Sequence, residues 1–125
     1  MYSNQARNAY VGSSVTTAGP ARLLVMLVER LVLDLERAQA AQQAGNHSEA
    51  TTHLVHAQDI VFELEASLKP EMFSAGPQLA SIYAFLRSQL VQANVRRDLG
   101  TTQWCLGLAT ALCDTWRTAA LQAAH

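Results

Sequence analysis

The 125-residue sequence lacks an excess of charge of either sign, with nine Lys and Arg residues against ten Asp and Glu residues. A basic patch for nucleic acid is therefore not expected, and Arg96-Arg97 is the only adjacent basic pair. Aromatic residues are scarce at 6%, whereas half of the chain is hydrophobic. This composition favours closely packed helices over a β-sandwich or barrel, and the length suits a single domain.

No apolar run is long enough to span a bilayer. The longest, LLVMLV at 23–28, ends at Glu29 and is far shorter than the roughly 20 residues that a membrane helix needs. The first ten residues, MYSNQARNAY, are polar and lack the apolar segment of a secretory signal. We therefore expect a cytosolic protein without membrane insertion.

The sequence also lacks the usual marks of catalysis. No glycine-rich phosphate loop occurs. Cys105 and Cys113 lie on one expected helix, about 12 Å apart along its axis, which is too far for a disulfide. Free thiols of this kind are usually core residues in a reducing compartment. The sequence predicts no enzyme and no cofactor.

Hydrophobic periodicity predicts four helices, at residues 20–44, 47–68, 77–98 and 102–122. Mostly short connections favour antiparallel neighbours, so the expected fold is an all-α, antiparallel up-down four-helix bundle. Residues 1–19 have no sustained apolar period and are expected to form a mobile or loosely docked N-terminal arm. The predicted domain division is therefore this arm followed by a helical bundle over residues 20–122.

Each expected helix has one apolar stripe and plausible capping residues. Asn46 and Glu49 are spaced to cap the second helix, and Thr101 or Thr102 to cap the fourth. The stripes consist of Leu23, Leu24, Leu27, Val28, Leu31, Leu35 and Ala38; Ala50, Leu54, Ala57, Val61, Leu64 and Leu68; Leu79, Ile82 or Tyr83, Leu86, Leu90 and Ala93; and Cys105, Leu108, Leu112, Trp116 and Ala119.

One arrangement has the spacing of metal ligands. Glu49, His53 and His56 can share a helix face, with His47 close in sequence. Carboxylate di-metal bundles, however, need matching ligands from other helices, and the other three helices offer no inward Glu or His set. We expect solvated histidines and no metal, and a metal-binding bundle remains an alternative.

Apolar residues exceed what four stripes require. Residues 23–28 are apolar almost all round the first helix, and Ile60 and Phe62 lie outside the main stripe of the second. Exposed apolar surface of this kind marks partner sites. The arm or a second copy could instead cover it, and single exposed leucines are common on protein surfaces.

An ordered series of motifs covers nearly the whole chain. It consists of Tyr10, VTTAGP at 15–20, LLVML at 23–27, AQDIVFELEASL at 57–68, LASIYAFL at 79–86, ANVRRD at 93–98, and Leu112, Asp114 and Trp116. This series resembles the flagellar secretion chaperone (FliS) family. The chain departs from the family pattern at Gly19, Val28-Glu29, Lys69 and Ala84. These departures concern surface polarity, and therefore partner contacts more than the bundle.

The resemblance implies a cytosolic export chaperone. Such a protein binds the C-terminal segment of flagellin, prevents its premature polymerisation and supports its delivery to the flagellar type III export apparatus. The arm around Tyr10 and Val15 would cover the binding groove when it is empty. Further partners would be the export gate or a second copy in a homodimer, and a self-associating structural or regulatory bundle is an alternative function. The candidate partner-binding residues are Tyr10, Val15, Leu24, Val28, Ile60, Leu64, Tyr83, Leu90 and Asn94.

Overall fold

The computed structural model describes residues 19–72 and 74–123. It contains the α-helices α2 (Pro20–Gln43), α3 (His47–Ser67), α4 (Gly76–Val95) and α5 (Leu99–Ala123), with a short 3₁₀-helix, η1 (Pro70–Met72), between α3 and α4. The predicted antiparallel up-down four-helix bundle is confirmed. The expected arm lies almost entirely outside the described residues, so the division into an arm and a bundle stays a prediction.

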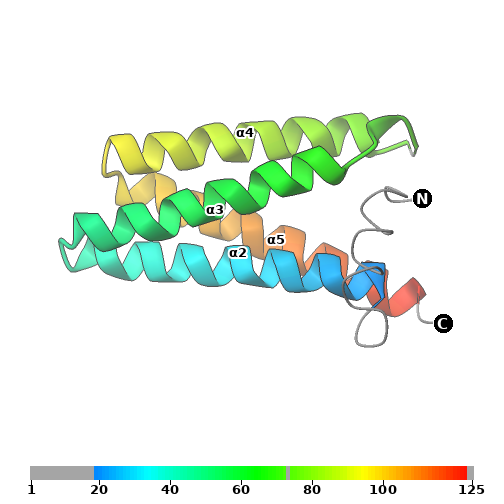
Figure 1. The fold of residues 1–125 in the computed structure, drawn as a ribbon, viewed down its shortest axis with the longest axis horizontal. Helices are drawn as coiled ribbons and strands as arrows, with labels where there is room; N and C mark the ends of the chain where they lie inside the picture. Colours follow the sequence, from blue (N-terminus) through cyan, green and yellow to red (C-terminus); the bar gives the residue numbers. More distant parts are fainter. Residues whose placement is uncertain (1–18, 73, 124–125) are drawn as a thin grey trace.

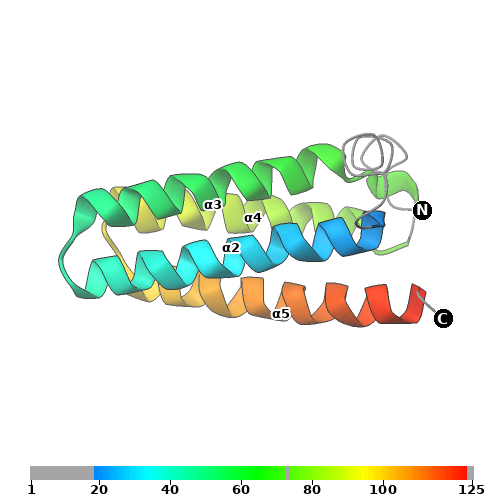
Figure 2. The same ribbon diagram turned by 60° about the horizontal axis from the view of Figure 1, so that its bottom comes forward.

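The four long helices run alternately up and down, and each packs on the next along the chain (Figure 1). The last helix, α5, returns beside the first, so the neighbours form a closed ring in the order α2, α3, α4, α5 (Figure 2). The interface between α4 and α5 is the least extensive of the four. The start of α2 and the end of α5 lie at the same end of the bundle.

Local sequence explains where the first connection turns. Gly45 follows α2 with φ of 73°, a conformation that L side chains rarely adopt. The next residue, Asn46, then caps α3: its Oδ1 accepts from the backbone N–H of Glu49 at 3.1 Å, and its Nδ2 donates to the Glu49 carboxylate at 3.0 Å. The predicted capping role of this pair is confirmed.

The fourth helix begins earlier than expected, and its cap is a different residue. The third helix ends at Val95 rather than at 98, and α5 begins at Leu99 rather than at 102. The backbone N–H of Thr101 donates to the carboxylate of Asp98 at 3.2 Å, so Asp98 and not a threonine caps this helix. Thr102 is fully buried, and its hydroxyl donates to the Asp98 carbonyl at 3.3 Å.

The core follows the predicted stripes closely in α3 and less closely in α5, where Leu108, Trp116 and Ala119 are only partly buried. Every expected residue of α3 is buried. In α2, Leu23 and Leu27 are only partly buried, whereas Val25 and Ala41 join the core. In α4, Tyr83 rather than Ile82 takes the fully buried position.

One charged residue belongs to this core, at a position outside the stripe predicted for this helix. Asp34 on α2 is fully buried and lies one turn from the buried residues Leu31 and Ala38. Its carboxylate pairs with Nδ1 of His56 on α3 and lies 3.3 Å from Nε of Arg30, one turn earlier on α2. A buried carboxylate needs such partners, because desolvation without them would be costly.

Candidate partner-binding surface

The structure places most of the predicted partner-binding residues in the interior. Leu24, Val28, Ile60, Leu64, Tyr83 and Leu90 are all buried in one hydrophobic cluster. They therefore support the bundle itself, and a partner would reach them only if helices separated. Ile60 in particular is not surplus to the core of α3 as the sequence suggested, because it lies one turn from both Ala57 and Leu64 on the buried side.

The remaining predicted residues differ from this group. Asn94 is partly exposed near the end of α4, and its Oδ1 accepts from the hydroxyl of Thr51 on α3 at 2.8 Å. Tyr10 and Val15 lie outside the described residues. The contact of all nine residues with a partner stays a prediction.

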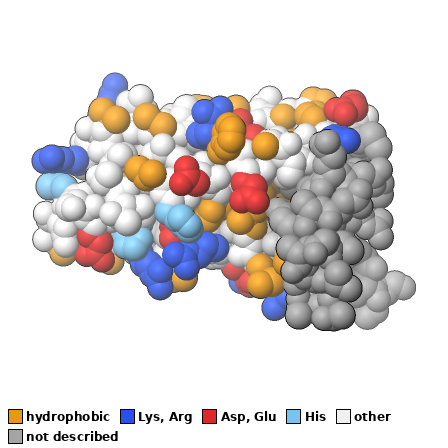
Figure 3. All heavy atoms as spheres, viewed as in Figure 1, with side chains coloured by type: hydrophobic (Ala, Val, Ile, Leu, Met, Phe, Trp, Pro, Cys, Tyr) orange, Lys and Arg blue, Asp and Glu red, His pale blue; other side chains and the backbone are white. Residues whose placement is uncertain are grey.

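Large hydrophobic side chains are nevertheless exposed on every long helix. On the face seen in Figure 3 they are scattered among cationic, acidic and histidine side chains and form no continuous patch. Phe62, predicted as surplus to the α3 stripe, is 63% exposed. The exposed set consists of Met26, Leu33, Val55, Phe62, Phe85, Val91, Val95, Trp104 and Leu121.

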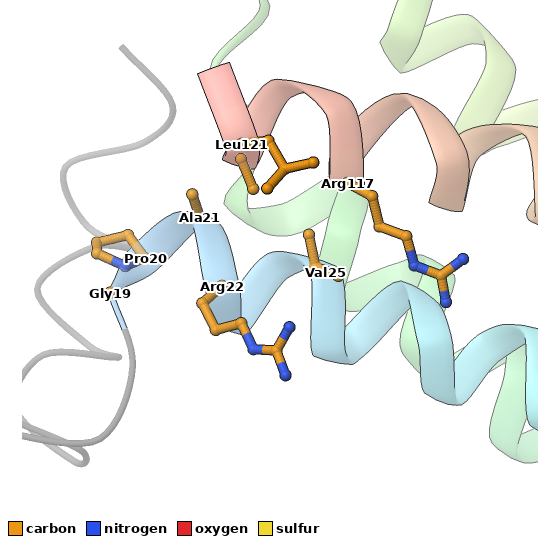
Figure 4. A pocket seen from close by; sticks show the side chains of 8 residues that line it. Gly19, Pro20, Ala21, Arg22, Val25, Arg117 and Leu121 are labelled. Carbon is orange, nitrogen blue, oxygen red and sulfur yellow. The ribbon is translucent and has the colours of Figure 1, made fainter. Parts of the chain in front are cut away.

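A first concave site lies between the start of α2 and the end of α5. This α2–α5 groove has a volume of about 540 Å³ and is lined by Gly19, Pro20, Ala21, Arg22, Val25, Arg117, Ala120 and Leu121. Ala21 and Val25 project from α2 toward α5, where Leu121 lies (Figure 4). Leu121 is 66% exposed, so apolar surface remains open to a partner at this end of the bundle.

The two arginines of the α2–α5 groove differ in their ion pairing. The guanidinium of Arg117 donates to the Glu29 carboxylate at 2.8 Å and lies 3.5 Å from that of Asp114. Arg22 makes no ion pair with any residue in the described ranges. The groove is therefore mainly apolar, and Arg22 places at its edge a positive charge that has no ion-pair partner among residues 19–72 and 74–123.

A second concave site lies between α4 and α5. This α4–α5 groove has a volume of about 320 Å³ and is lined by Gln78, Ser81, Ile82, Phe85, Trp104 and Leu108. The rings of Phe85 and Trp104 meet edge to face across it, with centroids 5.5 Å apart. Both aromatic residues are about half exposed. Sequence analysis assigned neither of them, because their exposure depends on how α4 and α5 pack.

The residues weighed as metal ligands do not converge. His53 Nε2 lies 3.6 Å from the Glu49 carboxylate within α3, whereas His56 turns to Asp34 on α2. No group of three His, Cys, Asp or Glu side chains that could hold a metal ion occurs among residues 19–72 and 74–123. His56 is exposed to solvent as expected, with 46% of its side chain accessible, although it also pairs with a buried carboxylate.

The two cysteines are free thiols inside the bundle. Burial raises the pKa of Cys105 to about 12. Burial also raises the pKa of Cys113. Because the thiolate is the reactive form, neither position favours nucleophilic chemistry. Within the described part of the chain, every helix is too short or too polar to cross a membrane.

Comparison with known proteins decides the family. The model of the family described as flagellar protein FliS matches residues 2–123. The chain belongs to this FliS family. It is therefore a member of a family of flagellar secretion chaperones and not of an enzyme family.

Two relatives and one solved structure agree with this assignment. A flagellar secretion chaperone FliS of Bacillus subtilis (strain 168) is 29% identical over 111 residues, which cover 89% of this chain and 83% of the relative. The flagellar secretion chaperone FliS of Escherichia coli (strain K12) is 28% identical over 123 residues, covering 94% and 90%. A crystal structure of a bacterial flagellar chaperone has the same fold, with a TM-score of 0.76 at 18% identity over 94% of this chain and 97% of that one.

Proposed function

We propose that this FliS-family chain is a cytosolic export chaperone that binds the C-terminal segment of flagellin, prevents its premature polymerisation and supports its delivery to the flagellar type III export apparatus. The observation that carries the proposal is the family match over residues 2–123. Two apolar grooves support it, because concave apolar surface between helices suits an amphipathic segment.

The physical task requires extensive but reversible binding. An unfolded segment that folds on the chaperone loses about 2–5 kcal/mol of its interaction energy to ordering, while burying on the order of 1,000–3,000 Å². Affinity therefore stays moderate although the contact is large. Such a complex shields the apolar face of flagellin and still releases it, without any need for nucleotide hydrolysis.

The α2–α5 groove is one proposed site for this segment, and the arm is its proposed competitor. The groove is lined in part by Gly19, the last residue of the predicted arm that carries Tyr10 and Val15. We expect these two side chains to occupy apolar surface in the empty chaperone and to yield it to flagellin. The predicted contacts of Leu24, Val28, Ile60, Leu64, Tyr83, Leu90 and Asn94 remain part of the proposal and require the helices to part during binding.

The test is a titration of the full chain with a peptide from the C-terminal segment of the host's own flagellin. Calorimetry should show binding, and far-UV circular dichroism should show a rise in helicity beyond the sum of the two components. Leu121→Glu should weaken binding, and Tyr10→Ala should strengthen it if the arm competes. A cognate peptide that neither binds nor gains helicity would refute the proposed function.

A further inference from the structure

The interfaces of the bundle differ in the charged groups that join them. An ion pair between Glu65 and Arg87 joins α3 to α4, and an ion pair from Arg117 to Glu29 joins α5 to α2. Arginine and glutamate keep their charges throughout the neutral pH range. The α2–α3 interface is instead joined through His56, and histidine is the side chain whose charge changes between about pH 5 and pH 8.

The partner of His56 makes the α2–α3 interface sensitive to this change of charge. Asp34 is the only fully buried charged residue among residues 19–72 and 74–123. Its Oδ2 contacts Nδ1 of His56, whereas its Oδ1 lies 3.3 Å from Nε of Arg30 and accepts no hydrogen bond from the described residues. His56 therefore supplies both a positive charge and the hydrogen bond that this carboxylate receives across the interface.

The two members of the pair differ in their access to solvent. The side chain of His56 is about half exposed and exchanges its proton with water, whereas that of Asp34 is shielded completely. While the imidazole is protonated, the contact is an ion pair, and Arg30 adds a second positive charge. When the imidazole is neutral, Arg30 alone opposes the buried negative charge. The α2–α3 interface is therefore expected to weaken as rising pH removes the proton from His56.

Other charged groups near the pair do not replace the charge of His56. Those one turn from either member are Arg30 and Arg37 on α2, and His53 and Asp59 on α3. Of these, only Arg30 contacts the Asp34 carboxylate, and His53 instead faces Glu49. The single charged residue of α4 is paired with α3, and the two charged residues of α5 contact each other and a glutamate of α2.

We propose that Asp34 and His56 form a pH-sensitive switch of the α2–α3 interface, closed while His56 carries its proton and released when the proton is lost. The inference concerns the bundle alone and does not rest on the proposed function. Its consequence is access to the interior, because separation of α2 from α3 would uncover buried apolar side chains of both helices, such as Val28 and Ile60.

The experiment follows urea unfolding of the full chain from about pH 6 to about pH 8.5, a range that spans the titration of histidine. His56→Gln removes the titrating group and keeps a hydrogen-bond donor, and Asp34→Asn removes the buried charge. His53→Gln is the matched control, because His53 lies one turn earlier on α3 and its partner, Glu49, is exposed. An NMR titration of the imidazole of His56 gives the pH at which its proton is lost.

The inference predicts that the unfolding midpoint of the wild type falls by about 0.5 M urea relative to that of His56→Gln as His56 loses its proton. Asp34→Asn should have the same pH profile as His56→Gln, and His53→Gln the profile of the wild type. Parallel profiles of the wild type and His56→Gln would overturn the inference, as would a profile of His53→Gln that matches His56→Gln.

Hydrogen exchange of the wild type tests the position of the switch without any variant. Amide protection factors around Asp34 and His56 should fall about fivefold over the same pH range, while those in α4 beside α5 stay unchanged. An equal fall in all four helices would show a loss of global stability rather than release of one interface, and would overturn the inference.

Discussion

The buried carboxylate of Asp34 gives a sharp prediction about stability. It lies between α2 and α3, and its two side-chain contacts are His56 across the interface and Arg30 on its own helix. Replacing His56 by alanine removes the one cross-helix partner that the described residues supply, and leaves the buried carboxylate with Arg30 at 3.3 Å. The loss should exceed that of an ordinary surface pair.

The magnitude follows from the kind of interaction. A hydrogen bond to a charged group contributes about 1.5–3 kcal/mol, and Arg30 still compensates part of the charge. We therefore expect His56→Ala to lower the free energy of unfolding by about 2 kcal/mol. With a urea m-value of about 2 kcal/mol/M, the unfolding midpoint should fall by about 1 M.

A second substitution tests the reason for the loss. Adding Asp34→Leu to His56→Ala removes the stranded charge and fills its place with an apolar side chain, so the double variant should recover most of the lost stability. The control is His53→Ala, which breaks an ion pair within α3 to the exposed Glu49 and should cost about 0.5 kcal/mol or less. Urea unfolding followed by circular dichroism measures all three variants. Equal losses in the two histidine variants, with no recovery in the double variant, would contradict the reasoning.

Three further predictions concern single positions. The hydrogen bond from the N–H of Thr101 lowers the pKa of Asp98, so this cap stabilises α5 fully above the ordinary aspartate pKa and loses its effect as the pH falls through the lowered value. Asp98→Ala should therefore lower the melting temperature at pH 7, and the difference from the wild type should shrink below about pH 4, with Asp98→Asn as control. Gly76→Ala should destabilise the fold by about 1–3 kcal/mol in urea unfolding, because a Cβ there would lie 2.0 Å from the Pro70 carbonyl oxygen; unchanged stability would contradict this contact. Cys105 should stay unlabelled by a thiol reagent at pH 8 in native protein and react once urea unfolds the chain, and rapid native labelling would show that its burial is wrong.

The second helix was predictable because its local signals agree with its packing. Apolar residues from Ala50 to Leu68 recur at three- and four-residue spacing, and the same residues are buried. The capping pair of Asn46 and Glu49 forms as expected, because it involves only residues close in sequence. The predicted start of α5 was wrong because the local signals do not single out one residue. Asp98, Thr101 and Thr102 can all cap a helix, and the tight turn after Val95 makes Asp98 the cap.

The grooves could not be read from periodicity. A stripe shows that a residue faces inward, but the exposure of Phe85 and Trp104 depends on how far α4 stands from α5. Most of the candidate partner-binding residues are strongly apolar, and strongly apolar positions are the ones that a bundle buries first. Asp34 shows the same limit, because its burial follows from partners on two helices rather than from its neighbours in sequence.

The shared location of the start of α2 and the end of α5 has a practical consequence for experiments on this chaperone. A segment attached after α5 would begin close to the α2–α5 groove, whereas the turn between α2 and α3 lies at the opposite end of the bundle (Figure 1). The same proximity makes a tethered complex feasible, since a flagellin segment joined to the C-terminus by a short flexible linker would be present at an effective concentration of about millimolar. Such a fusion would hold the proposed complex together long enough to determine its structure.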